Sequence, residues 1–186
     1  MTRLLGISGS LRTGSFNTAL LRNAAGLVPE GVSLEIRRLH GIPLYDADAE
    51  AASGLPDAVV DLKEAIASAD GVILATPEYN NGIPGVFKNA IDWASRPPGD
   101  IARVFGGRPF AILGASPGGF GTLLAQNDWL PVLRTLGATL WTGGRMLVSR
   151  ASGMFDENGA MGDPAVRNQL ATFLAGYTGF IRQKDD

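Results

Sequence analysis

The chain has 186 residues, of which 45% are hydrophobic and 18% charged, so it can fill the core of one domain and lacks the composition of a disordered chain. Its formal net charge of -2 argues against a nucleic-acid partner, and no apolar run is long enough to span a membrane. The absence of cysteine and the presence of a single histidine, His40, exclude disulfides, thiolate catalysis and any Cys- or multi-His metal site, so we expect no bound metal.

Apolar runs alternate with amphipathic stretches along the whole chain. Short apolar or alternating runs predict strands at residues 4–7, 32–39, 71–76, 109–113 and 139–148. Apolar residues at helical spacing predict helices at residues 17–27, 56–69, 84–95, 123–136 and 164–182. We expect a loop over residues 39–56 and a small excursion over residues 149–163. The N-terminus enters the first strand pattern directly, without the hydrophobic region of a signal peptide, so we expect a cytoplasmic location.

Regular alternation of strand and helix predicts parallel strands joined by right-handed crossovers. The expected fold is α/β: a flavodoxin-like three-layer sandwich, with a five-stranded parallel sheet of order 2-1-3-4-5 and helices on both faces. Residues 1–186 are expected to form one domain. In this strand order, ligands bind between the carboxyl ends of the first and third strands, where the order reverses. The loops that follow these strands are therefore the places to search for chemistry.

The loop after the first strand, residues 8–18, is rich in hydroxyls and glycines and runs into a helix. Backbone N–H groups, the helix N-terminus and the guanidinium of Arg12 together suit a phosphate. The loop contains neither a Gly-x-x-x-x-Gly-Lys-Ser/Thr nor a Gly-x-Gly-x-x-Gly motif. An ordinary helix start capped by Ser15 or Asn17 is the simpler alternative, but it leaves the other polar groups unexplained.

Two further loops are expected at the same edge of the sheet. Residues 77–85 contain two prolines, so this loop is stiff and its N–H groups could face a planar heterocycle, with Tyr79 adding a ring contact. A plain connecting turn remains the alternative, because Asn-Gly and Pro favour turns. Residues 115–121 are rich in glycine, which permits close backbone approach to a ligand or simply a flexible turn.

Residues 114–118 also match Gly-x-Ser-x-Gly, the nucleophile elbow of α/β hydrolases. Two features oppose an esterase. The only histidine, His40, precedes Ser116, whereas the triad order places it after the serine. Pro117 also has no N–H to give to an oxyanion hole. We therefore do not expect esterase activity.

Taken together, four segments resemble the NADPH-dependent FMN reductase family of flavodoxin-like proteins, and within it the bacterial chromate and quinone reductase-like members. The segments are residues 9–17, 42–48, 76–80 and 84–96. Their order and spacing fit this family from the first strand to the last helix, so the resemblance covers nearly the whole chain. It implies FMN as the bound cofactor and NADPH or NADH as the electron donor.

The resemblance also implies which residues bind the cofactor. The phosphate would lie against Ser10, Leu11, Arg12, Ser15, Phe16 and Asn17. The isoalloxazine ring would lie along Pro77, Glu78, Tyr79 and Asn80, with Ser116, Gly118 and Gly119 approaching from another side. No side-chain acid or base is required, because the flavin carries the chemistry. We interpret Glu78 as a residue that shapes its loop.

The expected function is ping-pong transfer of electrons from NAD(P)H to quinones, flavins, azo dyes or metal oxyanions such as chromate, in a homodimer or homotetramer. One alternative is a flavodoxin-like one-electron carrier, against which the small net charge argues. Another is a regulatory domain that has lost FMN. Trp93 and Trp129 are either core residues or part of a subunit interface. The candidates for contacting a 2′-phosphate of NADPH are Arg37, Arg38, Arg96 and Arg108, none of which stands in a motif.

Overall fold

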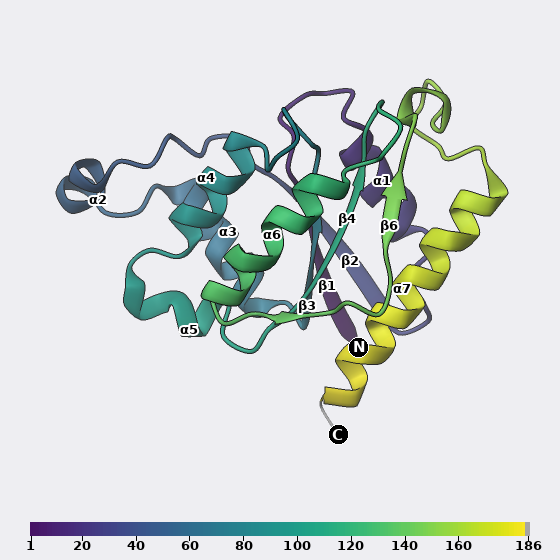
Figure 1. The fold of residues 1–186 in the computed structure, drawn as a ribbon. Helices are drawn as coiled ribbons and strands as arrows, with labels where there is room; N and C mark the ends of the chain where they lie inside the picture. The colour runs from purple at the N-terminus through teal and green to yellow at the C-terminus, as the bar shows by residue number, and fades with distance from the viewer. Residues whose placement is uncertain (185–186) are drawn as a thin grey trace.

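In a computed structural model, which describes residues 1–184, parallel strands form one sheet in the order β2-β1-β3-β4-β5, with β6 also paired to β4 (Figure 1). The predicted flavodoxin-like order is confirmed. All strand pairs in the sheet are parallel, so the strands end at the same edge. The strands are β1 (Thr2–Ser8), β2 (Val32–Arg38), β3 (Gly71–Ala75), β4 (Pro109–Ala115), β5 (Thr139–Leu140) and β6 (Met146–Val148).

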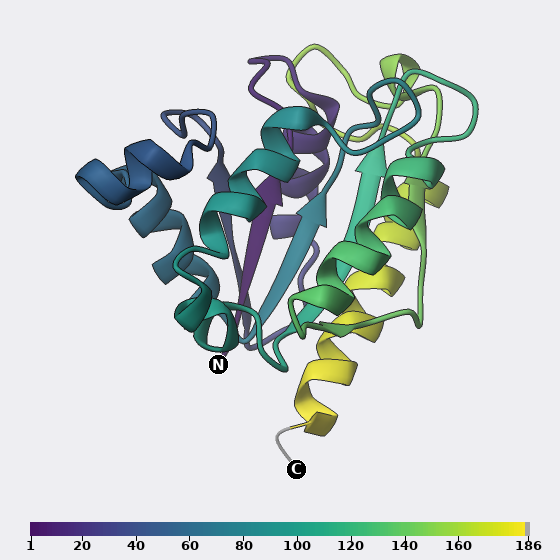
Figure 2. The same cartoon turned by 60° about the vertical axis from the view of Figure 1, so that its left-hand side comes forward.

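Helices cover both faces of this sheet (Figure 2). They are α1 (Phe16–Ala25), α2 (Ala47–Ser53), α3 (Asp57–Ser68), α4 (Gly85–Ala94), α5 (Ile101–Val104), α6 (Leu123–Thr135) and α7 (Pro164–Lys184). One apolar cluster lies between the sheet and α1 with α7, and a second lies between the sheet and α3, α4 and α6. The buried strands β1 and β3 contribute to both clusters, because successive side chains of a strand point to opposite faces. None of the helices within residues 1–184 has the length and apolar character needed to cross a membrane.

The single strand expected over residues 139–148 is wrong, because the chain forms two short strands there. β5 and β6 both pair with β4, but residues 141–145 between them leave the sheet. Trp141 packs edge-on against Phe173 of α7, with ring centroids 4.9 Å apart. A Cβ on Gly143 or Gly144 would lie 2.7 or 2.8 Å from the indole of Trp141. The two glycines therefore allow the backbone to bend around this ring, and the bend interrupts the strand.

Two short helices were also not expected. α2 lies inside the predicted loop at residues 39–56, where Asp46 caps it by accepting from the N–H groups of Asp48 and Ala49. None of its residues is buried. A helix without a buried face needs no apolar residues at helical spacing, so the pattern that would indicate a helix is missing from its sequence. α5 spans only Ile101–Val104, which is too short to show a period.

Both tryptophans singled out from the sequence belong to the core of the chain itself. Trp93 is 1% exposed and Trp129 is fully buried. The indole N–H of Trp93 donates to the carbonyl of Pro43 at 2.9 Å, and that of Trp129 donates to the hydroxyl of Thr76 at 3.1 Å. Of the two alternatives for these residues, core packing is therefore correct.

Candidate functional site

A cavity of about 370 Å³ opens at the carboxyl ends of β1, β3 and β4, where the strand order reverses. Its volume falls within the range of about 300–1,000 Å³ that is usual for small-molecule sites. It lies between the loops that follow these three strands, as the fold predicts. Its walls are formed by Ser10, Arg12, Ser15, Phe16, Asn17, Pro77, Glu78, Tyr79, Ala115, Ser116 and Pro117.

One end of the cavity is suited to an anion. Ser15 is the N-cap of α1, and its hydroxyl accepts from the N–H of Thr18 at 3.2 Å. Helix geometry leaves the N–H groups of Phe16 and Asn17 without partners inside the helix, and both residues line the cavity. The guanidinium of Arg12 lies over the ring of Phe16, 5.0 Å from its centroid. Positive charge and open N–H groups therefore meet at this end.

Asn17 connects two walls of the cavity. Its side-chain NH₂ donates to the carbonyl of Ala115, and its side-chain oxygen accepts from the N–H of the same residue, both at 2.9 Å. The side chain is 2% exposed. This pair of hydrogen bonds fixes the start of α1 against the end of β4, so Asn17 sets the width of the cavity as well as lining it.

The loop after β3 is a tight hairpin turn. Tyr79 and Gly82 exchange two backbone hydrogen bonds, at 3.2 and 3.1 Å. Between them, Asn80 and Asn81 have φ of 51° and 62°, as the two central residues of a type I′ turn require. Asparagine tolerates this left-handed conformation better than most residues. The turn holds Tyr79 at the mouth of the cavity, where half of the side chain is exposed.

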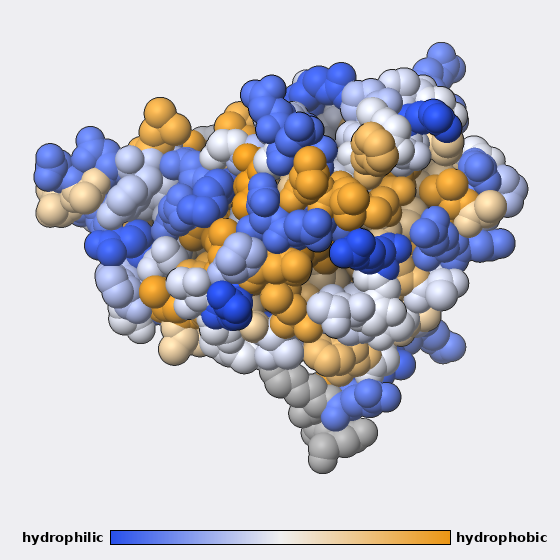
Figure 3. Space-filling model, viewed as in Figure 1, coloured by the Kyte–Doolittle hydropathy of each residue, from blue (hydrophilic) through white to orange (hydrophobic). Residues whose placement is uncertain are grey.

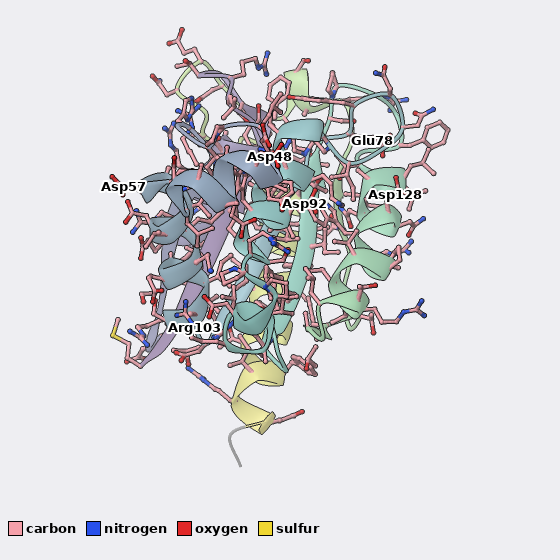
Figure 4. All side chains as sticks on the ribbon, turned by 90° about the vertical axis from the view of Figure 1, so that its left-hand side faces the viewer. Asp48, Asp57, Glu78, Asp92, Arg103 and Asp128 are labelled. Atoms are coloured by element: carbon pink, nitrogen blue, oxygen red, sulfur yellow. The ribbon has the colours of Figure 1, made fainter. Side chains whose placement is uncertain are left out.

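Glu78 extends from the same loop to the beginning of α6. Its Oε2 accepts from the N–H groups of Leu124 and Ala125 at 2.8 and 3.0 Å. The first turn of α6 contains no acidic residue, and its N-cap Thr122 makes no side-chain capping bond. Figure 4 shows Glu78 above the start of the helix that carries Asp128. The carboxylate is thus engaged in holding two loops together, in agreement with our interpretation of this residue.

Ser116 is not arranged as a nucleophile. Its hydroxyl donates to the carbonyl of Gly121, within the same loop. The ring nitrogen Nε2 of His40 contacts the carbonyl of Leu11 at 3.1 Å, after a different strand. His40 is the only histidine of the chain, so residues 1–184 contain no hydrogen-bonded Ser–His pair, and the esterase alternative finds no support.

Most of the residues implicated by the sequence line this one cavity, but four do not. Leu11 and Asn80 are exposed and adjoin residues that line it. Gly118 and Gly119 lie farther along the loop after β4, where the carbonyl of Gly118 accepts from the N–H of Arg150. The four are Leu11, Asn80, Gly118 and Gly119. Conversely, Ala115 and Pro117 line the cavity without having been singled out. Both are adjacent to Ser116 in the sequence, and this adjacency could have placed them among the predicted site residues.

The four arginines considered for a 2′-phosphate all have partners within the chain. Two contact carboxylates and two contact backbone carbonyls, and Arg37 and Arg96 do so through Nε. The contacts are Arg37 to Glu35 at 2.6 Å, Arg96 to Glu50 at 2.8 Å, Arg108 to the carbonyl of Val104 at 2.8 Å, and Arg38 to the carbonyls of Leu11 and Arg12 at 2.9 and 3.0 Å.

Comparison with known proteins agrees with the geometry. Residues 2–153 match the model of the family described as NADPH-dependent FMN reductase. An NAD(P)H-dependent FMN reductase of Pseudomonas aeruginosa is 45% identical over 181 residues, which cover 97% of this chain and 96% of the relative. A 2-hydroxy-1,4-benzoquinone reductase of a Burkholderia species is 39% identical over 96% of this chain and 95% of its own. The solved structure of FerB, a flavoenzyme NAD(P)H:(acceptor) oxidoreductase from Paracoccus denitrificans, matches with a TM-score of 0.87 and 30% identity, over 98% of both chains.

Proposed function

Because this chain belongs to the NADPH-dependent FMN reductase family, we propose that it uses FMN to pass electrons from NADPH or NADH to quinones or free flavins. The relatives named as reductases of FMN and of a hydroxybenzoquinone support this choice of acceptors. Azo dyes and metal oxyanions such as chromate are further acceptors within the proposal. The observation that carries it is the single cavity that joins an anion-binding end to a rigid loop bearing an aromatic side chain.

The residues that line the cavity fit FMN. The phosphate would be held by Arg12, by the hydroxyls of Ser10 and Ser15, and by the open N–H groups at the start of α1. The isoalloxazine ring would lie along Pro77 and Tyr79, which line the same cavity from the loop after β3. When bound, FMN supplies the redox chemistry, accepting a hydride from the nicotinamide and passing two electrons to the acceptor.

The chain's own residues bind and orient. Arg12 neutralises charge on the phosphate, while Asn17 keeps the loop after β4 at a fixed distance from α1. Glu78 ties the loop after β3 to the start of α6, and the Tyr79–Gly82 hydrogen bonds close the turn within that loop. No side chain has to transfer a proton for this function, so we assign no catalytic acid or base.

The test is a visible spectrum of the protein reconstituted with FMN and mixed anaerobically with NADPH or NADH. We expect retained flavin bands that bleach promptly and return when a benzoquinone is added. Loss of all flavin on gel filtration would overturn the cofactor assignment. Retained bands that resist both nicotinamides would favour the one-electron carrier.

A pair of variants tests the phosphate end of the cavity. Arg12→Met is expected to weaken FMN retention. Arg22→Met, at an exposed position in the last turn of α1, removes the same charge and serves as the control.

We further propose a homodimer or homotetramer that works in the cytoplasm, where reduced nicotinamides are held. Apolar residues gather over α6 (Figure 3), where Leu124 and Leu130 are 43% and 39% exposed. Apolar patches of this kind support an interface between subunits. Light scattering at micromolar concentration is expected to give a multiple of the monomer mass, which Leu130→Glu reduces and Val60→Glu, equally exposed on α3, does not. A monomer mass for the unaltered protein would refute the proposal.

A further inference from the structure

The loop that follows β1, residues 8–18, is called the phosphate-side loop below. Arg38 and His40 contact its backbone from outside the cavity. One nitrogen of Arg38, Nη2, donates to the carbonyls of Leu11 and Arg12 at 2.9 and 3.0 Å. Nε2 of His40 lies 3.1 Å from the carbonyl of Leu11. Since a carbonyl only accepts, His40 must donate from this nitrogen. Three contacts from the end of β2 therefore converge on two consecutive peptide groups.

The sheet places Arg38 where it can make these contacts. Arg38 is the last residue of β2 and is paired in register with Ser8, the last residue of β1, from which the loop departs. Leu34 and Ile36 of β2 pack into the cluster beneath α1, and Arg38 shares their side of the strand by alternation. The side chain thus lies on the same face of the sheet as the helix that the loop enters.

Holding these carbonyls also decides where the next N–H groups point. In a planar trans peptide the C=O and N–H bonds are antiparallel. With the carbonyls of Leu11 and Arg12 turned to Arg38, the N–H groups of Arg12 and Thr13 must face the opposite way. The N–H of Arg12 is indeed directed at the hydroxyl of Ser10, at 3.3 Å, and Ser10 lines the cavity. Consecutive N–H groups with a common direction form an anion-binding nest.

The position of Arg38 is unfavourable in one respect, because it buries a hydrogen-bond donor that has no partner in the described part of the chain. Its Nε is buried and has no hydrogen-bond partner in residues 1–184. Burying an unpaired donor is unfavourable, so the side chain is held for the contacts that Nη2 makes. Within the same residues no carboxylate forms an ion pair with Arg38, which leaves its positive charge uncompensated beside the loop.

We propose that Arg38, assisted by His40, is a positioning residue that fixes the backbone of residues 11–13, so that the N–H of Thr13 and the Ser10 hydroxyl, which accepts from the N–H of Arg12, face the phosphate of FMN. This inference rests on the proposed FMN site. It assigns Arg38 no contact with the cofactor: the residue acts through the backbone of the loop. It also accounts for the placement of Leu11, which is next to the cavity but does not line it, because its carbonyl is the one that both side chains hold.

The test compares the dissociation constants of FMN and riboflavin, which lacks the phosphate, by quenching of flavin fluorescence in the apoprotein. Arg38→Met is expected to weaken FMN binding about tenfold, the loss produced by about 1.4 kcal/mol, and to change riboflavin binding by less than about twofold. Arg37→Met is the matched control: it removes the same charge one residue away, where the side chain pairs with Glu35 instead of the loop. It should leave both constants unchanged.

Each other outcome has a defined meaning. An equal loss for both flavins, no loss for either, or an equal effect of Arg37→Met would overturn the positioning role. If Arg38→Met does not fold, His40→Ala decides the matter, because His40 is exposed and its replacement should weaken FMN alone by about threefold. Failure of the unaltered protein to bind FMN more tightly than riboflavin would instead refute the phosphate site of the proposed function.

Discussion

The carboxylate of Glu78 accepts a hydrogen bond from the backbone N–H of Leu124 at 2.8 Å, although the two residues are 46 positions apart. Leu124 belongs to the first turn of α6, where the helix dipole favours negative charge. One side chain therefore caps the helix that follows β4 and anchors the loop that follows β3. Two walls of the cavity are held in place by this contact.

Replacing Glu78 separates this structural role from a chemical one. Glu78→Ala is expected to lower the free energy of unfolding by about 1 kcal/mol, the usual effect of losing a helix cap. Glu78→Gln should lose less, because the amide oxygen still accepts, and should keep turnover near that of the unaltered enzyme. Urea denaturation and anaerobic reduction by NADPH measure the two effects. A stable Glu78→Gln variant with slow hydride transfer would show that the carboxylate takes part in the chemistry; Glu157→Gln, on an exposed turn, is the control.

Asn17 should matter both for stability and for the cofactor. Asn17→Ala leaves the N–H and C=O of Ala115 without their partner in a buried position, so we expect a loss of about 2–4 kcal/mol in the free energy of unfolding. FMN should also bind more weakly, because α1 and the end of β4 are no longer tied together. Chemical denaturation and flavin fluorescence provide the measurements.

Asn23 offers a matched control on the same helix. Its side chain also binds backbone at a distance, contacting Gly159 and Met161, but none of these three residues lines the cavity. Asn23→Ala is expected to lower the free energy of unfolding. The molecules that remain folded should bind FMN with the affinity of the unaltered protein. Equal effects of the two variants on FMN binding would mean that Asn17 has no particular role in shaping the site.

Glycine is required at one position of the phosphate-side loop and not at another. A Cβ on Gly9 would lie 2.1 Å from the ring of the fully buried Phe87, whereas a Cβ on Gly14 meets nothing within 4 Å. Gly9→Ala is therefore expected to displace the loop or the ring, lowering both the melting temperature and FMN affinity, and costing about 1–3 kcal/mol as overpacking does. Gly14→Ala should be tolerated. A Gly9→Ala variant as stable as Gly14→Ala would contradict the close packing of this loop on α4.

The ion pair between Arg96 and Glu50 predicts a loss of stability in acid. The hydrogen bond from Arg96 lowers the pKa of Glu50 below its ordinary value of 4.5, and a bond from the Tyr45 hydroxyl acts in the same direction. The stabilisation is therefore fully present above that value and is lost as pH falls through the folded pKa. Melting temperatures should fall less steeply below about pH 4.5 in Glu50→Gln than in the unaltered protein. Asp61→Asn, at an exposed carboxylate on α3, should leave the steepness unchanged.

The order of the elements follows from short-range patterns, which the sequence carries by itself. Buried strands such as β3 read as continuous apolar runs, and α4 repeats its apolar residues at helical spacing. Alternation of the two is enough to predict a parallel sheet and the edge at which ligands bind. The hydroxyls and Arg12 after β1, followed by a helix start, then indicate a phosphate at that edge.

What only the tertiary structure decided are the contacts between loops that are distant in sequence. The amide of Asn17 is matched to Ala115 across 98 positions, and Arg38 reaches the carbonyl of Leu11 from a neighbouring strand. The bend around Trp141 likewise depends on α7 packing against its ring. Local propensity determines which element forms. The partner of a side chain depends on how the elements pack together, and the spacing of apolar residues along the sequence does not show which elements will meet.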